Sequence, residues 1–208
     1  MNPFRNIFQL SVGDFLAKTL NFLAFVYLAR VLGVSQYGVL EFAVSILTYL
    51  LVLADGGLEL WATREAAQDR SVRRLAARVI PLRLLLAAGA FAALVALRPL
   101  LPDYANLEPV LLIFGLCVFA QALSLKWVFM GQEKMARVGG ALVIGQIVFA
   151  LGVFALVRDP SQLVWVAALR LASELAVAVY FARLFSAAHG GLRLALTLRG
   201  APEVLRAA

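Results

Sequence analysis

The sequence has few cysteines, histidines and charged residues, and each shortage excludes a class of protein. Its one cysteine is Cys117 and its one histidine is His189, which excludes a disulfide-stabilised scaffold and a zinc centre built on these residue types. Charged residues make up 15% of the chain, against about 25% in a typical soluble domain. No Gly-x-x-x-x-Gly-Lys loop is present, and no nucleophile–base pair stands out. We therefore expect a protein that is not an enzyme and that uses no cofactor and no metal.

Apolar residues, by contrast, are abundant. They make up 63% of the 208 residues, and the mean hydropathy is +0.90, which is more apolar surface than a soluble domain of this size can bury. A membrane-spanning helix needs about 20 mainly apolar residues. Six segments are long enough: 15–32, 37–60, 79–97, 110–129, 138–157 and 163–184. The sequence therefore predicts an all-α integral membrane protein, a six-transmembrane-helix bundle over residues 1–185. Small residues in the fifth segment predict close helix packing, namely Gly139, Gly140, Gly145 and Gly152.

The basic residues predict the orientation of this bundle. If the N-terminus is cytoplasmic, the inside segments hold twelve of them: Arg5, Arg64, Arg70, Arg73, Arg74, Arg78, Lys134, Arg137, Arg183, Arg193, Arg199 and Arg206. The outside segments hold three: Arg30, Arg98 and Arg158. This asymmetry favours cytoplasmic N- and C-termini. The same asymmetry explains the net charge of +7, because basic residues on the cytoplasmic side contact anionic lipid. We therefore expect membrane lipid, and no nucleic acid, as a partner. Residues 186–208 are expected to form a cytoplasmic amphipathic tail or a truncated linker to a second lobe.

Charged residues inside the predicted spans are the first candidates for a functional site, because each is costly in a bilayer and usually faces a bundle interior or a wet cavity. Arg170 and Glu174 lie four residues apart on one face of the sixth span. They form either an internal ion pair or a cavity wall that binds an anionic substrate or a coupling ion. Lys18 in the first span, four residues after Asp14, either lines the cavity or extends to the membrane surface.

A second set of charges surrounds the end of the second span. Asp55 and Glu59 flank a pair of glycines, an arrangement suited to proton or sodium coupling but also typical of a kinked helix end. Lys126 is a further candidate for the substrate cavity, although its position near the inner end of a span, like that of Arg83, favours extension to the membrane surface.

Several short motifs resemble a known family. Residues 21–38 contain an Ala-Arg-Val-Leu-Gly turn followed by Tyr-Gly, residues 53–58 read Leu-Ala-Asp-Gly-Gly-Leu, and residues 63–66 read Thr-Arg-Glu-Ala. Residues 127–135 read Trp-Val-Phe-Met-Gly-Gln-Glu-Lys-Met. Together they resemble the polysaccharide biosynthesis (O-antigen) flippases of the multidrug and polysaccharide exporter superfamily, over about residues 7–185. The positions that match the motifs are Arg30, Gly33, Tyr37, Gly38, Asp55, Gly57, Arg64, Trp127 and Gly131.

The resemblance implies a transport function. Members of this family have twelve to fourteen spans in two lobes, and they move an undecaprenyl-diphosphate-linked glycan across the bacterial inner membrane by alternating access. With six spans, the chain resembles the N-terminal lobe, which would work with a second six-helix lobe or as a homo-oligomer. In this interpretation Lys18, Lys126 and Arg170 attract the diphosphate, while Asp55, Glu59 and Glu174 hold the coupling ion. A small-molecule or drug antiporter of the same superfamily, and a non-transporting membrane scaffold or truncated remnant, stay open as alternatives.

Overall fold

The computed structural model describes residues 3–68 and 71–190, and all regular elements in these two ranges are helical. They are α1 (Pro3–Asp55), α2 (Leu58–Gln68), α3 (Val72–Leu97), α4 (Leu107–Ala122), α5 (Lys126–Gly131), α6 (Met135–Leu156) and α7 (Leu163–His189), with the 3-10 turns η1 (Arg98–Leu100) and η2 (Pro160–Gln162). Five helices of the described part are long and apolar enough to cross a membrane. The prediction of an all-α membrane protein is thus confirmed, whereas the expected tail falls almost entirely outside the described residues.

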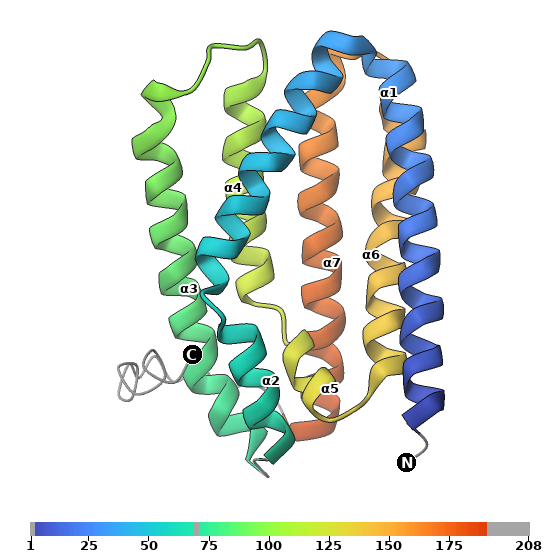
Figure 1. The fold of residues 1–208 in the computed structure, drawn as a ribbon, viewed down its shortest axis with the longest axis vertical. Coiled ribbons are helices and arrows are strands. Elements are labelled where there is room, and N and C mark those ends of the chain that lie inside the picture. Colours follow the sequence, from blue (N-terminus) through green and yellow to red (C-terminus); the bar gives the residue numbers. More distant parts are fainter. Residues whose placement is uncertain (1–2, 69–70, 191–208) are drawn as a thin grey trace.

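The longest helix, α1, is folded back on itself at Gly33. This residue has φ 70° and ψ 174°, a conformation that glycine adopts without the steric cost paid by other residues. α1 therefore consists of two limbs that run in opposite directions, with no loop between them (Figure 1). The limbs cover the first two predicted spans.

Two of the predicted spans end earlier than the hydrophobic pattern suggests. α1 stops at Asp55, because Gly56 and Gly57 have positive φ angles of 52° and 82° and start a new helix, α2. α4 stops at Ala122, and residues 126–131 form the separate short helix α5. The segment 63–78, which falls between the predicted spans 37–60 and 79–97, is helical on both sides of residues 69–70. The pattern overestimates these spans because apolar residues continue beyond each break.

Glycines bring the helices of the bundle close together, as the sequence predicts. A Cβ at Gly139 of α6 would lie 3.0 Å from the carbonyl oxygen of Gln9, and one at Gly13 would lie 2.6 Å from the Cα of Gly139. On another face of α6, the Ser173 hydroxyl donates a 2.7 Å hydrogen bond to the carbonyl oxygen of Gly145. α6 is thereby held against both α1 and α7.

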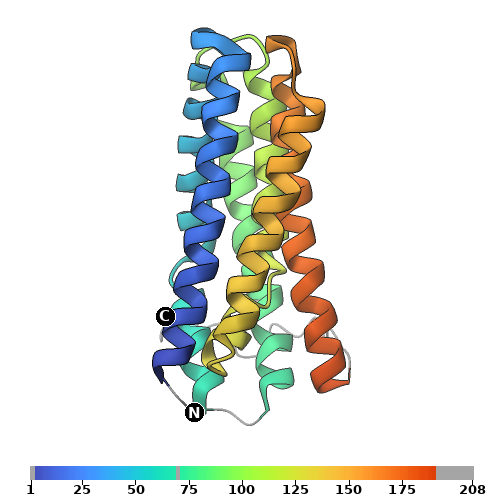
Figure 2. The ribbon, with the colours of Figure 1, turned by 90° about the vertical axis from the view of Figure 1, so that its right-hand side faces the viewer.

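The bundle has two distinct ends (Figures 1 and 2). At one end, called here the α2–α5 end, α1 begins, α7 ends, and the short helices α2 and α5 pack on each other. At the other, called the Gly33 end, lie the fold of α1 and the connection between α3 and α4. Most of the predicted inside arginines belong to elements of the α2–α5 end, which is the arrangement that the predicted orientation requires.

Candidate functional site

The centre of the charged site is Arg83, a residue expected to reach the membrane surface. That expectation is wrong. Arg83 as a whole residue is 4% exposed, and it is the one charged residue that is buried among those the structure describes. It lies in α3 directly after Ile80, Pro81 and Leu82, which are also buried, so this turn of α3 is enclosed by the rest of the bundle.

Arg83 connects three elements of the fold. Its guanidinium lies 3.5 Å from a carboxylate oxygen of Asp55 and 3.6 Å from one of Glu59. It also donates a 3.3 Å hydrogen bond to the carbonyl oxygen of Ser124, which follows the end of α4. Since the break at Gly56 and Gly57 separates the two carboxylates, Arg83 holds the end of α1 and the start of α2 in a fixed relation.

Both carboxylates of this cluster make further contacts. Glu59 forms a second ion pair, of 2.8 Å, with Lys126 of α5. Asp55 accepts a 3.2 Å hydrogen bond from the backbone N–H of Glu59, which caps the first turn of α2. The predicted ion-coupling residues Asp55 and Glu59 are thus balanced by two side-chain cations, and no group of three or more candidate metal ligands occurs within residues 3–68 and 71–190.

Arg170 and Glu174 form an ion pair of 2.9 Å along α7, and both are partly buried. They line a cavity of about 170 Å³ together with Glu59 and Lys126. The amide oxygen of Gln146, which lines the same cavity, has no hydrogen-bond partner among the described residues. Arg170 also lines a neighbouring, more apolar cavity of about 180 Å³ between α1, α4, α6 and α7. Arg170 therefore lines both a polar and an apolar compartment of the bundle.

The structure does not bring every candidate cation to this place. Lys18 pairs with Asp14 at 2.8 Å on the first limb of α1, and its side chain is 76% exposed. It lines neither of the two cavities that contain Arg170. Lys126 and Arg170 thus share a cavity with Glu59 and Glu174, whereas Lys18 lies apart from them.

The positions of the family motifs have mostly architectural contacts. Gly33 and Gly57 adopt positive φ, and a Cβ at Gly131 would lie 2.5 Å from the carbonyl oxygen of Thr63. Trp127 is fully buried under α2. The remaining positions vary in exposure, with Arg30, Gly38 and Arg64 exposed and Tyr37 partly buried. Among the motif residues, Asp55 alone belongs to the charged cluster.

Sequence reasoning missed Arg83 as a member of the site, although a signal was present. Two carboxylates four residues apart at a span end need counter-charges, because isolated charges at such depth are costly. An arginine preceded by Ile-Pro-Leu in the next span is the natural partner for them.

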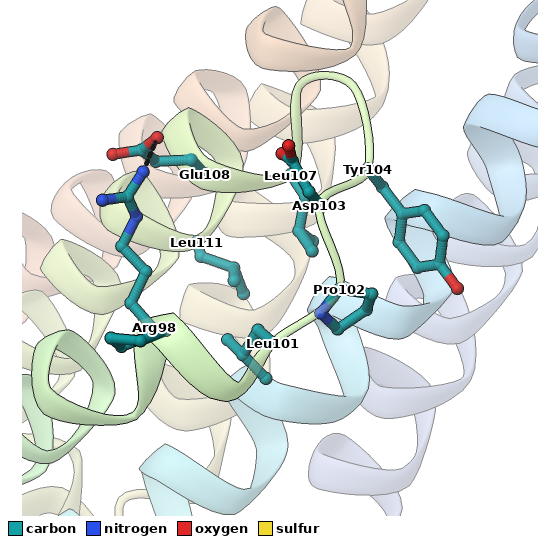
Figure 3. Close-up of a pocket in the computed structure, with 9 residues that line it drawn as sticks. Arg98, Leu101, Pro102, Asp103, Tyr104, Leu107, Glu108 and Leu111 are labelled. Atoms are coloured by element: carbon teal, nitrogen blue, oxygen red, sulfur yellow. Dashed lines mark hydrogen bonds and ion pairs between the residues drawn. The ribbon is translucent and has the colours of Figure 1, made fainter.

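A further pocket, larger than the two cavities lined by Arg170, lies at the Gly33 end and was not predicted (Figure 3). Its volume is about 340 Å³, and the connection between α3 and α4 forms its walls. On one side, Arg98 and Glu108 face each other and form an ion pair; on the opposite side, the Tyr104 ring points towards α1 (Figure 3).

Comparison with known proteins places the chain in a family. A family model described as polysaccharide biosynthesis protein matches residues 4–198, which is most of the chain. The chain belongs to this family. The earlier resemblance is thereby confirmed, and together with the long apolar helices it makes this polysaccharide biosynthesis protein a multi-pass membrane protein. Searches of curated proteins and of solved structures give no match.

Proposed function

We propose that this polysaccharide biosynthesis protein is a flippase, or one half of one, for a lipid-linked oligosaccharide. In this proposal the chain lies in the bacterial inner membrane, with the start of α1 and the end of α7 on the cytoplasmic side. It moves an undecaprenyl-diphosphate-linked glycan outward by alternating access, together with a second six-helix lobe or another copy of itself. No covalent bond is made or broken.

One observation carries the proposal. This chain belongs to the polysaccharide biosynthesis family, and its cationic residue Arg170 lines both a polar and an apolar cavity of the bundle. A diphosphate is strongly disfavoured in a low-dielectric path, and a fixed positive charge lowers that barrier. Arginine suits this role because its planar guanidinium can bind two phosphate oxygens at once. Lys126 adds a second cation to the wall of the same polar cavity.

The test compares substitutions of Arg170 in a host whose own copy of the gene has been removed. The quantity measured is surface glycan per unit of membrane-inserted protein. Arg170→Ala is expected to reduce export more than Arg170→Lys, since lysine keeps the charge and loses only the bidentate geometry. Arg158→Ala is the matched control, because Arg158 is exposed at the Gly33 end and lines none of these cavities.

A second variant separates transport from folding. Arg170→Ala leaves Glu174 without its partner, which by itself could lower the protein level. The double substitution Arg170→Ala with Glu174→Ala removes the unpaired acid and should restore the level. If export stays low in the double variant, the proposal is supported; if export recovers, the pair is structural.

A different result would indicate the alternative function, a small-molecule or drug antiporter. In that case a host without this chain would export glycan normally but become sensitive to small toxic compounds.

A further inference from the structure

The pocket at the Gly33 end has the size and lining of a ligand site. Its volume of about 340 Å³ falls within the range of about 300–1,000 Å³ that is common for small-molecule sites. Its walls are mostly apolar, formed by three leucines and two prolines: Leu101, Leu107, Leu111, Pro99 and Pro102. Four polar residues complete the lining, and all four are exposed: Arg98, Asp103, Tyr104 and Glu108. An apolar wall with a small number of polar groups is typical of sites that fix the orientation of a ligand.

The structure holds the walls of this pocket in place. Arg98, at the end of α3, forms an ion pair with Glu108 in the first turn of α4, which ties together the two helices that flank the connection. On the other side, the Tyr104 ring packs edge-on against Phe42 of α1, with 6.2 Å between the ring centroids. The connection is therefore fastened at both sides of the pocket.

The polar groups of the pocket favour hydroxyl donors over anions. Two carboxylates, Asp103 and Glu108, and one guanidinium, Arg98, line it. Asp103 forms no ion pair with any described residue, so its oxygens are available as acceptors. With one more negative than positive group, the pocket repels a carboxylate or a phosphate. A metal ion is also disfavoured, because Glu108 is already paired and the described residues contain no group of three metal ligands.

We propose that this pocket binds a single neutral or amino-sugar ring. The apolar wall contacts the C–H face of the ring, while Asp103 accepts hydrogen bonds from its hydroxyl groups. The biological source of the ligand rests on the function proposed above. If the protein is a flippase, this ring belongs to the glycan after the glycan has reached the outer side of the membrane. The chemistry of binding itself depends only on the pocket.

The experiment is saturation-transfer NMR on the purified full chain in detergent, with free monosaccharides as probes. Glucose and glucosamine are expected to give transfer signals, and glucuronate is expected to give none. Asp103→Asn should weaken binding about tenfold, the cost of one hydrogen bond to a charged group. Its matched control is Asp159→Asn, an exposed carboxylate at the same end that lies outside the pocket.

A pair of neighbouring leucines supplies a second comparison. Leu101→Trp places a large ring in the pocket and should abolish the signals, whereas Leu100→Trp should not, because Leu100 is exposed and does not line the pocket. Circular dichroism of each variant establishes that it is folded. The proposal is overturned if neutral sugars give no signal, if glucuronate binds equally well, or if both tryptophan variants behave alike. The NMR assay measures binding and involves no transport. Sugar binding can therefore be observed even if glycan export turns out not to depend on Arg170, so the two proposals can fail separately.

Discussion

Removal of Arg83 is expected to destabilise the whole α2–α5 end of the bundle. The test substitution is Arg83→Met, which keeps the length of the side chain and removes its charge. Breaking a buried ion pair by deleting one partner costs about 3–5 kcal/mol. The side chains of Asp55 and Glu59 are 32% and 26% exposed, and their distances of 3.5 and 3.6 Å exceed the ~2.8 Å of a short charged hydrogen bond. We therefore expect the lower end of the range, about 3 kcal/mol.

A loss of this size shifts the unfolding equilibrium by about two powers of ten. The measurement is SDS-induced unfolding in mixed micelles, followed by circular dichroism. Arg83→Lys should lose about half as much, since it keeps one charge but cannot reach both carboxylates and a carbonyl together. Adding Asp55→Asn to Arg83→Met should recover about 1 kcal/mol, because it removes a carboxylate left without its partner.

The matched control is Arg78→Met, an exposed arginine on the same helix that should change stability by about 0.5 kcal/mol at most. If Arg83→Met unfolds at the same SDS concentration as this control, the cluster contributes nothing to stability. If the double variant is less stable than Arg83→Met alone, the unpaired Asp55 carboxylate is not the source of the loss, and its hydrogen bond to the Glu59 backbone N–H matters more.

Two further substitutions test the packing and the orientation. Gly131→Ala should cost about 1–3 kcal/mol in the same unfolding assay, because its Cβ would lie 2.5 Å from the backbone oxygen of Thr63; Gly89→Ala, with open space around it, should cost nothing. For the orientation, Ser35→Cys at the Gly33 end should react with a membrane-impermeant thiol reagent in intact cells, whereas Arg73→Cys should react only after lysis; the native thiol is buried. Labelling of Arg73→Cys alone in intact cells would reverse the predicted orientation, and labelling of both positions would contradict it.

The helices could largely be predicted from composition because hydrophobic length is a strong signal in a membrane protein. Their breaks could be predicted less well. The glycine pair after Asp55 suggested a weak helix end, and the structure shows a complete break there. The break after Ala122 has no comparable signal, since residues 123–125 contain neither glycine nor proline. There the chain leaves the helix where the Ser124 carbonyl accepts a hydrogen bond from Arg83, a contact between residues 41 positions apart.

The ion pairs also differ in how well they could be predicted, according to whether both partners lie on one helix or on different helices. The pairs Asp14–Lys18 and Arg170–Glu174 follow from helical spacing, because residues four apart share one face. Arg83 could not be assigned in this way, since its partners lie on other helices and its depth depends on how α3 packs. The pocket at the Gly33 end was missed because neither its volume nor its walls correspond to a sequence motif.

The balance of charge inside the bundle has a consequence for how the protein is made. Asp55 and Glu59 emerge from the ribosome before Arg83, and Lys126 follows later still. A charge at the centre of a membrane helix costs about 2.5–3.5 kcal/mol on insertion, and a charge at the end of a span costs less. The end of the second span therefore carries a part of this penalty until α3 arrives with Arg83. α7, by contrast, brings Arg170 and Glu174 as a pair that neutralises itself. The arrival of α3 is thus the step at which the early helices can first settle in the membrane, and a variant without Arg83 should be cleared during biosynthesis rather than after assembly.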